Sequence, residues 1–148
     1  MGGTIPAMER TYTTPLLDKL GIRPGMRVAI VGALHDDDET TDATEFRSSL
    51  RDRTSDIRDG TPEPDTDIVL LAADTTGDLA VLARLRPRIR PNGAIWVVSR
   101  KGKAATLRDV EVIAAARDHE LIDNKVVSFS PSRTALRLVI PVALRPRA

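Results

Sequence analysis

The sequence predicts an α/β domain with a mostly parallel sheet, helices on both faces and an antiparallel hairpin at the carboxyl end. Three continuous apolar runs, each bounded by turn residues, are typical of strands buried on both faces, as in parallel sheets. The runs cover 28–31, 68–73 and 94–98. Segments with helical apolar spacing separate them, and alternation of strand and helix favours right-handed crossovers within one sheet.

A short helix is expected before the first strand. Thr14 and Pro15 match an N-cap residue followed by proline at the first helical position. Residues 1–13 before it are expected to form a flexible arm. A single domain is expected over 14–142, followed by a tail over 143–148.

The first strand is expected to lie between a turn and a polar loop. Pro24 and Gly25 fit the centre of a type II turn, because proline fixes φ and glycine accepts a positive φ. The strand ends at Gly32, and four consecutive acids follow at 36–39. Thr41 is expected to cap the next helix. The apolar side of that helix recurs at helical spacing and consists of Ala43, Phe46 and Leu50.

In the middle of the chain we expect a weak edge strand near Ile57, followed by the second buried strand and then another helix. Thr75 or Thr76 is expected to cap that helix, and Pro87 should kink or thin its last turn. Its inner side would consist of Leu79, Leu82, Leu85 and Ile89. A turn at 91–93 then leads into the third buried strand.

One more helix and a hairpin are expected to complete the chain. Thr106 and Asp109 resemble a capping box, with a shorter acid than usual. The inner side of the helix would consist of Val110, Ile113, Ala114 and Leu121. Strands at 126–129 and 136–140 would flank a turn at 131–132. The last strand alternates in polarity, which predicts that it is half exposed.

The composition argues against several classes of protein. A net charge of +1 and an aromatic content of 3% make nucleic acid an unlikely partner. The chain has no cysteine, which excludes a disulfide scaffold, a thiolate metal site and a thiol nucleophile. No apolar run reaches the roughly 18 residues of a membrane span, and no signal peptide is evident. We therefore expect a cytoplasmic protein with no membrane partner.

The chain plan resembles that of the class I methyltransferases. The most specific segment is 85–98, which reads Leu-Arg-Pro-Arg-Ile-Arg-Pro-Asn-Gly before an apolar run. Methyltransferases often have a leucine, a basic residue, a proline and two glycines at this point, and Asn92 stands in for the first glycine. The resemblance covers about 25–140. It implies a Rossmann-like methyltransferase fold.

The chain also resembles a family of small actinobacterial proteins of unknown function, which look like shortened methyltransferases. The matching segments are 14–16, 19–22, 24–29, 32–33, 67–71, 96–97, 101–102 and 136–138. This resemblance covers nearly the whole chain. The family has no activity to transfer, so the resemblance supports the fold and leaves the function open.

Methyltransferases hold S-adenosylmethionine at the carboxyl end of the first strand, where the usual pattern is acid-x-Gly-x-Gly-x-Gly. If Gly32 is the first glycine, Ile30 takes the acid position. Leu34 and Asp36 then take the positions of the other two glycines, so that only one of the four positions is filled. Leu34 would put a side chain where the cofactor needs room. We therefore expect no cofactor, with S-adenosylmethionine as the alternative.

Three acids near strand ends are relevant to that alternative. In methyltransferases an acid at the end of the second strand normally binds the ribose hydroxyls, and Asp56 or Asp59 would serve here. Asp74 ends the second buried strand, where methyltransferases often keep a polar residue near the substrate. It would equally cap the next helix. Gly32 and Asp74 are the weak cofactor-binding candidates.

Open parallel sheets bind ligands beyond the carboxyl ends of their strands, so the loops at that edge supply further candidates. The anion-binding candidates are Ser99, Arg100, Lys101 and Lys103, which precede a helix N-terminus. Alternatively, these cations pair with acids across the same edge. The weak metal-binding candidates are His35, Asp36 and Asp38, and the alternative is a solvated loop.

The leading functional hypothesis is a non-catalytic ligand-binding or regulatory module, with a small molecule or a protein as its partner. The first alternative is an S-adenosylmethionine-dependent methyltransferase with an aberrant donor loop. The second is a structural or assembly protein, in which the exposed hairpin strand forms a homodimer edge. No catalytic residue is assigned, because the chain has no G-x-S-x-G elbow and no histidine is assignable to Ser99.

Overall fold

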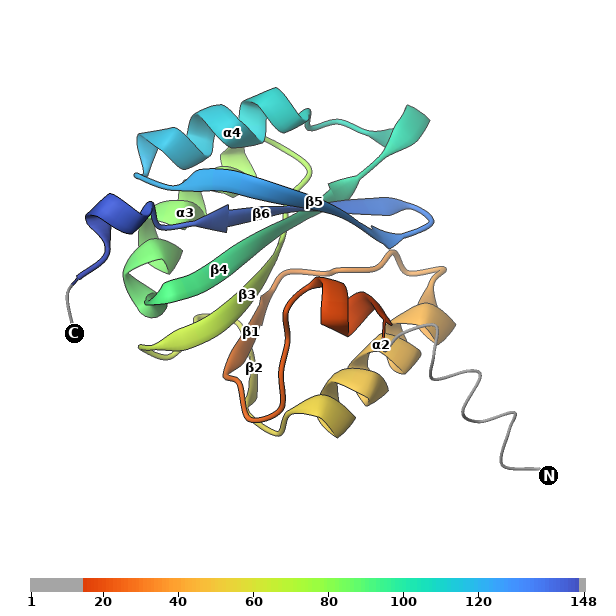
Figure 1. Ribbon diagram of the computed structural model, residues 1–148. Helices are drawn as coiled ribbons and strands as arrows, with labels where there is room; N and C mark the ends of the chain where they lie inside the picture. The colour runs from red at the N-terminus through yellow and green to blue at the C-terminus, as the bar shows by residue number, and fades with distance from the viewer. Residues whose placement is uncertain (1–14, 147–148) are drawn as a thin grey trace.

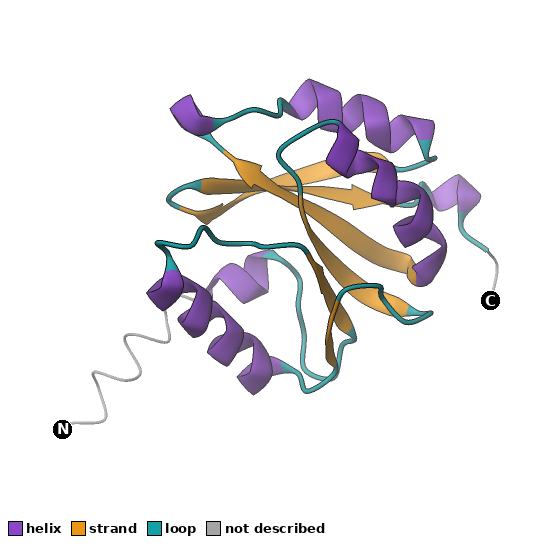
Figure 2. Ribbon diagram, turned by 180° about the vertical axis from the view of Figure 1, so that it is seen from behind, coloured by secondary structure: helices purple, strands orange, loops and turns teal. Residues whose placement is uncertain are grey.

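A computed structural model describes residues 15–146 of the chain. The predicted arm at 1–13 and the predicted cap at Thr14 lie outside the described residues. Within them the chain forms one six-stranded sheet with helices on both faces, seen from opposite sides in Figures 1 and 2. This confirms the expected α/β architecture. No helix in this part of the chain is long and apolar enough to cross a membrane.

The strand order is β2-β1-β3-β4-β6-β5. The strands are β1 (Val28–Val31), β2 (Ile57–Asp59), β3 (Thr66–Ala72), β4 (Ile89–Arg100), β5 (Ile122–Ser130) and β6 (Arg133–Val139). Strands β2, β1, β3 and β4 are parallel, and β6 runs antiparallel between β4 and β5. The carboxyl ends of the four parallel strands therefore meet at one edge of the sheet.

The helices divide between the two faces of the sheet. A helical turn at 15–19 and α2 (Thr40–Arg53) cover one face, while α3 (Leu82–Leu85) and α4 (Asp109–Asp118) cover the other (Figure 1). Short 3₁₀ turns complete the connections: η1 (Gly77–Val81), η2 (Arg86–Arg88), η3 (Gly102–Ala104) and η4 (Val142–Leu144). The turn η4 crosses the predicted boundary between domain and tail.

Two apolar layers form the core because successive side chains of each strand point to opposite faces. Leu70 packs with Trp96 and Leu50 on the α2 side, and Val69 packs with Leu82 on the α3 and α4 side. Full burial of each leucine contributes roughly 1.5–3 kcal/mol. The indole N–H of Trp96 donates to the Leu20 carbonyl at 3.0 Å, so this buried polar group is satisfied.

The predicted helix between β3 and β4 is much shorter than its apolar spacing suggested. Only the four residues of α3 are α-helical, and Pro87 lies in the 3₁₀ turn that follows. Proline has no N–H to donate and its ring crowds the preceding turn, so the helix ends there. Ile89, predicted on the inner side of the helix, instead begins β4. The predicted turn at 91–93 lies inside β4, where the register with β3 is irregular.

The prediction for α4 was wrong in its cap and partly wrong in its buried side. Arg108 occupies the N-cap position and Glu111 completes the capping box, in place of Thr106 and Asp109. Val110 is 62% exposed, while Val112 and Ala116 are buried. Apolar residues occur on every side of this helix, so their spacing could not identify the buried side.

Two further predictions were wrong. The last strand, β6, is not half exposed, because Ala135 and Val139 are buried on one face of the sheet and Leu136 and Leu138 on the other. The edge strand is β5. Thr41 does not cap α2, because the helix begins one residue earlier and its N-cap position is Glu39.

Gly93 lies where the backbone of β4 has no room for a side chain beside β3. A Cβ atom on Gly93 would lie 2.8 Å from the carbonyl oxygen of Asp67 and 3.1 Å from that of Arg90. Both neighbours are backbone atoms in the sheet and cannot rotate away. Gly93, which was predicted to lie in a turn, is therefore required by the packing of β4 against β3.

We expect Gly93→Ala to lower the free energy of unfolding by about 1–3 kcal/mol, as other overpacked sites do. Urea unfolding followed by circular dichroism measures this loss. Gly77→Ala is the control, because its Cβ would meet only the Thr75 hydroxyl, at 3.6 Å. Equal unfolding midpoints for both variants would contradict this account of Gly93.

Candidate functional site at the carboxyl edge of the sheet

The loop at 32–39 leaves β1 and crosses the carboxyl edge of the sheet. Gly32 begins it with a φ of 88°, in the left-handed region that favours glycine. A Cβ there would also lie 3.1 Å from the Cβ of Ala72, so β3 leaves little room for a side chain at this position. Leu34 is only 6% exposed and packs in the core with Phe46. Its side chain thus anchors the loop from below.

Two acids and two arginines meet at this loop. We call them the edge cluster, which consists of Asp36, Asp74, Arg100 and Arg133. The Asp36 carboxylate accepts hydrogen bonds from Arg100 at 2.9 Å and from Arg133 at 2.8 Å. Asp74 accepts the backbone N–H of Arg100 at 3.0 Å and a longer bond, 3.4 Å, from Arg133. Arg133 is only 2% exposed, so these acids neutralise a buried charge.

The edge cluster shifts the titration of its members and neighbours. Hydrogen bonds from Arg100 and then Arg133 lower the pKa of Asp36, and the bond to Asp36 raises the pKa of Arg100. The pKa of Glu39 is lowered because its carboxylate accepts the backbone N–H of Asp36 and the Ser132 hydroxyl. The acids at both ends of the 36–39 run therefore hold the loop in place.

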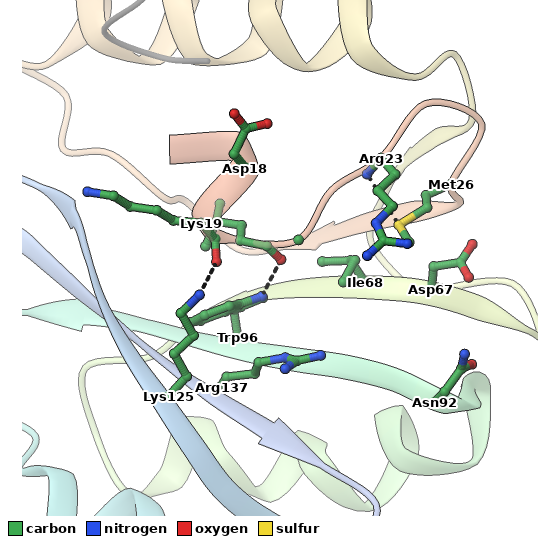
Figure 3. A pocket seen from close by; sticks show the side chains of 12 residues that line it. Asp18, Lys19, Arg23, Met26, Asp67, Ile68, Asn92, Trp96, Lys125 and Arg137 are labelled. Carbon is green, nitrogen blue, oxygen red and sulfur yellow. Dashed lines mark hydrogen bonds between the residues drawn. The ribbon is translucent and has the colours of Figure 1, made fainter. Parts of the chain in front are cut away.

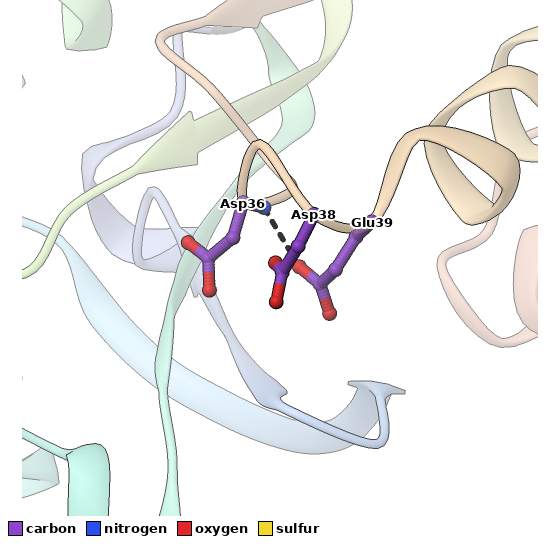
Figure 4. A group of neighbouring side chains, drawn as sticks. All are labelled: Asp36, Asp38 and Glu39. Atoms are coloured by element: carbon purple, nitrogen blue, oxygen red, sulfur yellow. Dashed lines mark hydrogen bonds between the residues drawn. The ribbon is translucent and has the colours of Figure 1, made fainter.

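The metal-binding hypothesis finds little support in this geometry. Carboxylate oxygens of Asp36, Asp38 and Glu39 lie within 4.8 Å of one another. Figure 4 shows the three side chains on the loop before α2. Asp36 and Glu39, however, already bind groups of the protein. His35 is not part of this group, because its ring packs against Phe46 and Phe129, with centroids 5.9 and 5.5 Å away.

The four anion-binding candidates do not converge. Ser99 is buried in β4, and Lys101 donates to the Ser128 hydroxyl at 2.7 Å. Lys103 is exposed in η3. Among the acids of residues 15–146, Arg100 pairs with Asp36 and Asp74 across the edge, whereas Lys101 and Lys103 pair with none, so the alternative interpretation holds for Arg100.

The cofactor candidate Asp74 does not cap the helix after β3 through its side chain. Thr75 has that role, as the sequence predicted for Thr75 or Thr76, because its hydroxyl accepts the backbone N–H of Asp78 at 3.1 Å. The Asp78 carboxylate in turn accepts the backbone N–H groups of Asp74 and Thr75. The Asp74 carboxylate faces Arg100 and Arg133 instead. Asp74 therefore connects the end of β3 to β4 and β6.

Two adjoining hollows lie between the loop and α2, and we call them together the β1–α2 groove. One, of about 200 Å³, is lined by Gly32, Ala33, Leu34 and Phe46 among others. The other, of about 440 Å³, is more open and is lined by Asp37, Thr40, Thr44 and Arg51 among others. Both are lined by His35, Ala43 and Arg47. The groove has apolar walls at its Gly32 end and charged walls further out.

Asp59 is the last residue of β2 and lies beside Ile30 of β1 at the carboxyl edge. Arg47 of α2 donates to both of its carboxylate oxygens, each at 2.9 Å, and this bond lowers the pKa of Asp59. Asp56 precedes β2 at the opposite edge, where it pairs with Arg27. The register thus selects Asp59 from the two acids considered. Arg47 gave no signal in the sequence, since helical arginines are usually solvated.

Comparisons with solved structures show the fold. The chain superposes on the mitomycin 7-O-methyltransferase MmcR with a TM-score of 0.57 and 15% identity, covering 94% of this chain and 55% of that one. It superposes on the magnesium protoporphyrin IX methyltransferase of Synechocystis, solved with bound S-adenosylmethionine, with a TM-score of 0.55 and 11% identity, covering 91% of this chain and 79% of that one. On an S-adenosylmethionine-dependent methyltransferase of Aquifex aeolicus, the TM-score is 0.53 and the identity 12%, with 87% of this chain and 89% of that one covered.

The chain has the Rossmann-like methyltransferase fold, as the sequence predicted. At these identities the likeness establishes the fold alone. Neither a family model nor a curated protein matches the chain.

Replacing Arg133 with alanine should lower the free energy of unfolding by about 2–4 kcal/mol, because it leaves two carboxylates without their buried partner. Denaturant unfolding at neutral pH measures the loss. Arg117→Ala, at an exposed position in the last turn of α4, should change it by less than about 0.5 kcal/mol. Similar losses in the two variants would show that the edge cluster does not stabilise the fold.

Burial lowers the pKa of His35, so the folded state favours the neutral imidazole. This contribution to stability is complete above the unfolded pKa of about 6.5 and is lost as pH falls through the folded pKa. In His35→Phe, which keeps a packed ring, unfolding free energy should fall less between about pH 7 and pH 5 than in the parent. Carboxylates titrate mainly below that window, so parallel pH profiles for the two proteins would contradict the assignment.

Proposed function

We propose that this domain binds S-adenosylmethionine in the β1–α2 groove and is a methyltransferase. The observation that carries the proposal is the position of Asp59, a carboxylate at the end of the second strand. It lies beside Ile30 of β1, two residues before Gly32, and accepts hydrogen bonds from Arg47; Ile30, Gly32 and Arg47 all line the groove. In the methyltransferases that the sequence resembles, an acid at this point binds the ribose hydroxyls of the donor.

The residues around the groove fit the ribose end of the donor. A carboxylate has about four acceptor positions, and Arg47 uses two of those on Asp59, so capacity remains for two hydroxyl donors. Leu34 and Phe46 supply apolar wall, and Gly32 keeps side-chain atoms away from the turn. The expectation that Leu34 would fill the cofactor's space is weakened, since Leu34 packs into the core beneath the loop.

The charges of the loop favour a cationic donor. When bound, S-adenosylmethionine supplies a methyl group on a positively charged sulfonium. Asp37 and Asp38 are exposed on the loop, and Asp37 lines the groove. Their negative potential attracts a cation and disfavours phosphorylated ligands, such as dinucleotides.

A second candidate is a non-catalytic module that binds the same ligand as an effector. The edge cluster favours it, because Asp36 and Asp74 are occupied by Arg100 and Arg133, where an enzyme would keep polar groups free for substrate. Ile30, at the acid position of the donor pattern, is buried in the core. The resemblance to the small actinobacterial family stays a prediction and assigns no activity to either candidate.

Thermal unfolding with millimolar S-adenosylmethionine, or with its demethylated product, tests donor binding. A ligand at about 100 times its dissociation constant adds about 2.7 kcal/mol, which gives a clear rise in the midpoint. Asp59→Asn should abolish the rise. Asp56→Asn should retain it, because that acid is similarly exposed and ion-paired but lies at the other edge. Absence of a rise in the parent protein would refute the proposal.

Donor turnover separates the two candidates. If the donor binds, more demethylated product released in cell extract with the parent protein than with Asp59→Asn would support the methyltransferase. Donor binding with equal release for the two proteins would favour the effector-binding module.

A further inference from the structure

A second pocket, of about 290 Å³, lies at the amino edge of the parallel strands, and we call it the amino-edge pocket. It lies beyond the start of β3, at the opposite edge from the β1–α2 groove, and shares no lining residue with it. Figure 3 shows it beside the indole of Trp96. Its apolar walls are Leu20, Met26, Ile68 and Trp96. The pocket is therefore separate from the proposed donor site.

The two acids that line the amino-edge pocket are already neutralised. Asp18 accepts a hydrogen bond from Arg53 at 2.9 Å. Asp67 pairs with Arg90 at 3.1 Å and accepts the backbone N–H of Arg27 at 2.9 Å. These acids therefore contribute little net negative potential to the pocket.

Four cations line the same pocket, Lys19, Arg23, Lys125 and Arg137, and none of them pairs with a carboxylate of residues 15–146. Lys125 donates one hydrogen bond, to the Lys19 carbonyl at 3.2 Å, and keeps two N–H groups. In Figure 3, Arg23 reaches in from the loop before β1 and Arg137 extends along the sheet. Like charges gathered beside apolar walls repel one another, and a bound anion would relieve that repulsion.

The sheet register fixes two of these cations beside the indole. Arg137 of β6 is the register partner of both Trp96 of β4 and Lys125 of β5. Arg137 is half-buried, so its guanidinium is partly removed from water. Partial desolvation strengthens its attraction for an anion that enters the pocket.

We propose that the amino-edge pocket binds a small organic anion, with a carboxylate or phosphate head held by Arg23, Lys125 and Arg137. Its apolar body lies against Met26 and Ile68. A volume of about 290 Å³ equals that of about ten water molecules, so the ligand has on the order of ten non-hydrogen atoms. Guanidinium groups suit this role because their paired N–H donors match carboxylate and phosphate oxygens. The site does not depend on donor binding in the β1–α2 groove.

The chain's single tryptophan provides the test. Because there is one tryptophan, its indole N–H gives one isolated cross-peak in a ¹H–¹⁵N spectrum of the whole protein. Because Trp96 lines the pocket, this cross-peak reports on ligand binding there. Phenyl phosphate and benzoate serve as probes, with benzyl alcohol as a neutral control, each in the millimolar range. We expect a saturable shift of the cross-peak with at least one anion and none with benzyl alcohol. The anion that binds more tightly identifies the head group as phosphate or carboxylate.

Variants connect the shift to the cations. Arg137→Gln and Lys125→Gln should each weaken binding by about tenfold, through loss of a charge-assisted hydrogen bond. Arg117→Gln on the opposite face makes the same charge change and should leave binding unaltered. The spectrum of each variant also reports whether it is folded. The proposal is overturned if neither anion moves the cross-peak, if benzyl alcohol moves it equally, or if both folded pocket variants bind like the parent.

Discussion

The buried charge of Arg133 constrains the carboxyl edge of the parallel sheet. An arginine that is 2% exposed is costly unless carboxylates approach it, and here the partners come from two other loops. Asp36 reaches it from the loop after β1, and Asp74 from the end of β3. That requirement holds the loop down over β4 and β6. The open space at this edge is consequently left on the side of α2, between the loop and Arg47.

Much of the fold could be predicted because its strands are short apolar runs in a parallel sheet. Burial on both faces leaves little choice of residue, so 28–31, 68–73 and 94–98 could be identified without register information. The hairpin was predictable from its turn and its apolar strands. The buried side of α4 was not, since Val110 and Val112 are equally apolar and only tertiary packing distinguishes them.

The candidate site was less predictable, because its contacts join residues far apart in the chain. Arg133 pairs with Asp36 across 97 positions, and no local pattern marks either residue as a partner of the other. Asp59 could be selected over Asp56 only after the register of β2 against β1 was known. The predicted pairing of Arg100 with acids succeeded because both lie at the same strand ends. For the amino-edge pocket the sequence held no signal, since its cations come from three separate segments.

The bond between the Trp96 indole and the Leu20 carbonyl spans 76 positions of the chain. It links the residue that follows the first described helical turn to β4, and it closes a long loop. Closing such a loop costs conformational entropy, and the contacts that offset this cost form only after β4 is in place. The β5–β6 hairpin, by contrast, forms from neighbouring residues. The amino-edge pocket, which requires both ends of this long-range contact, would therefore be completed late in folding.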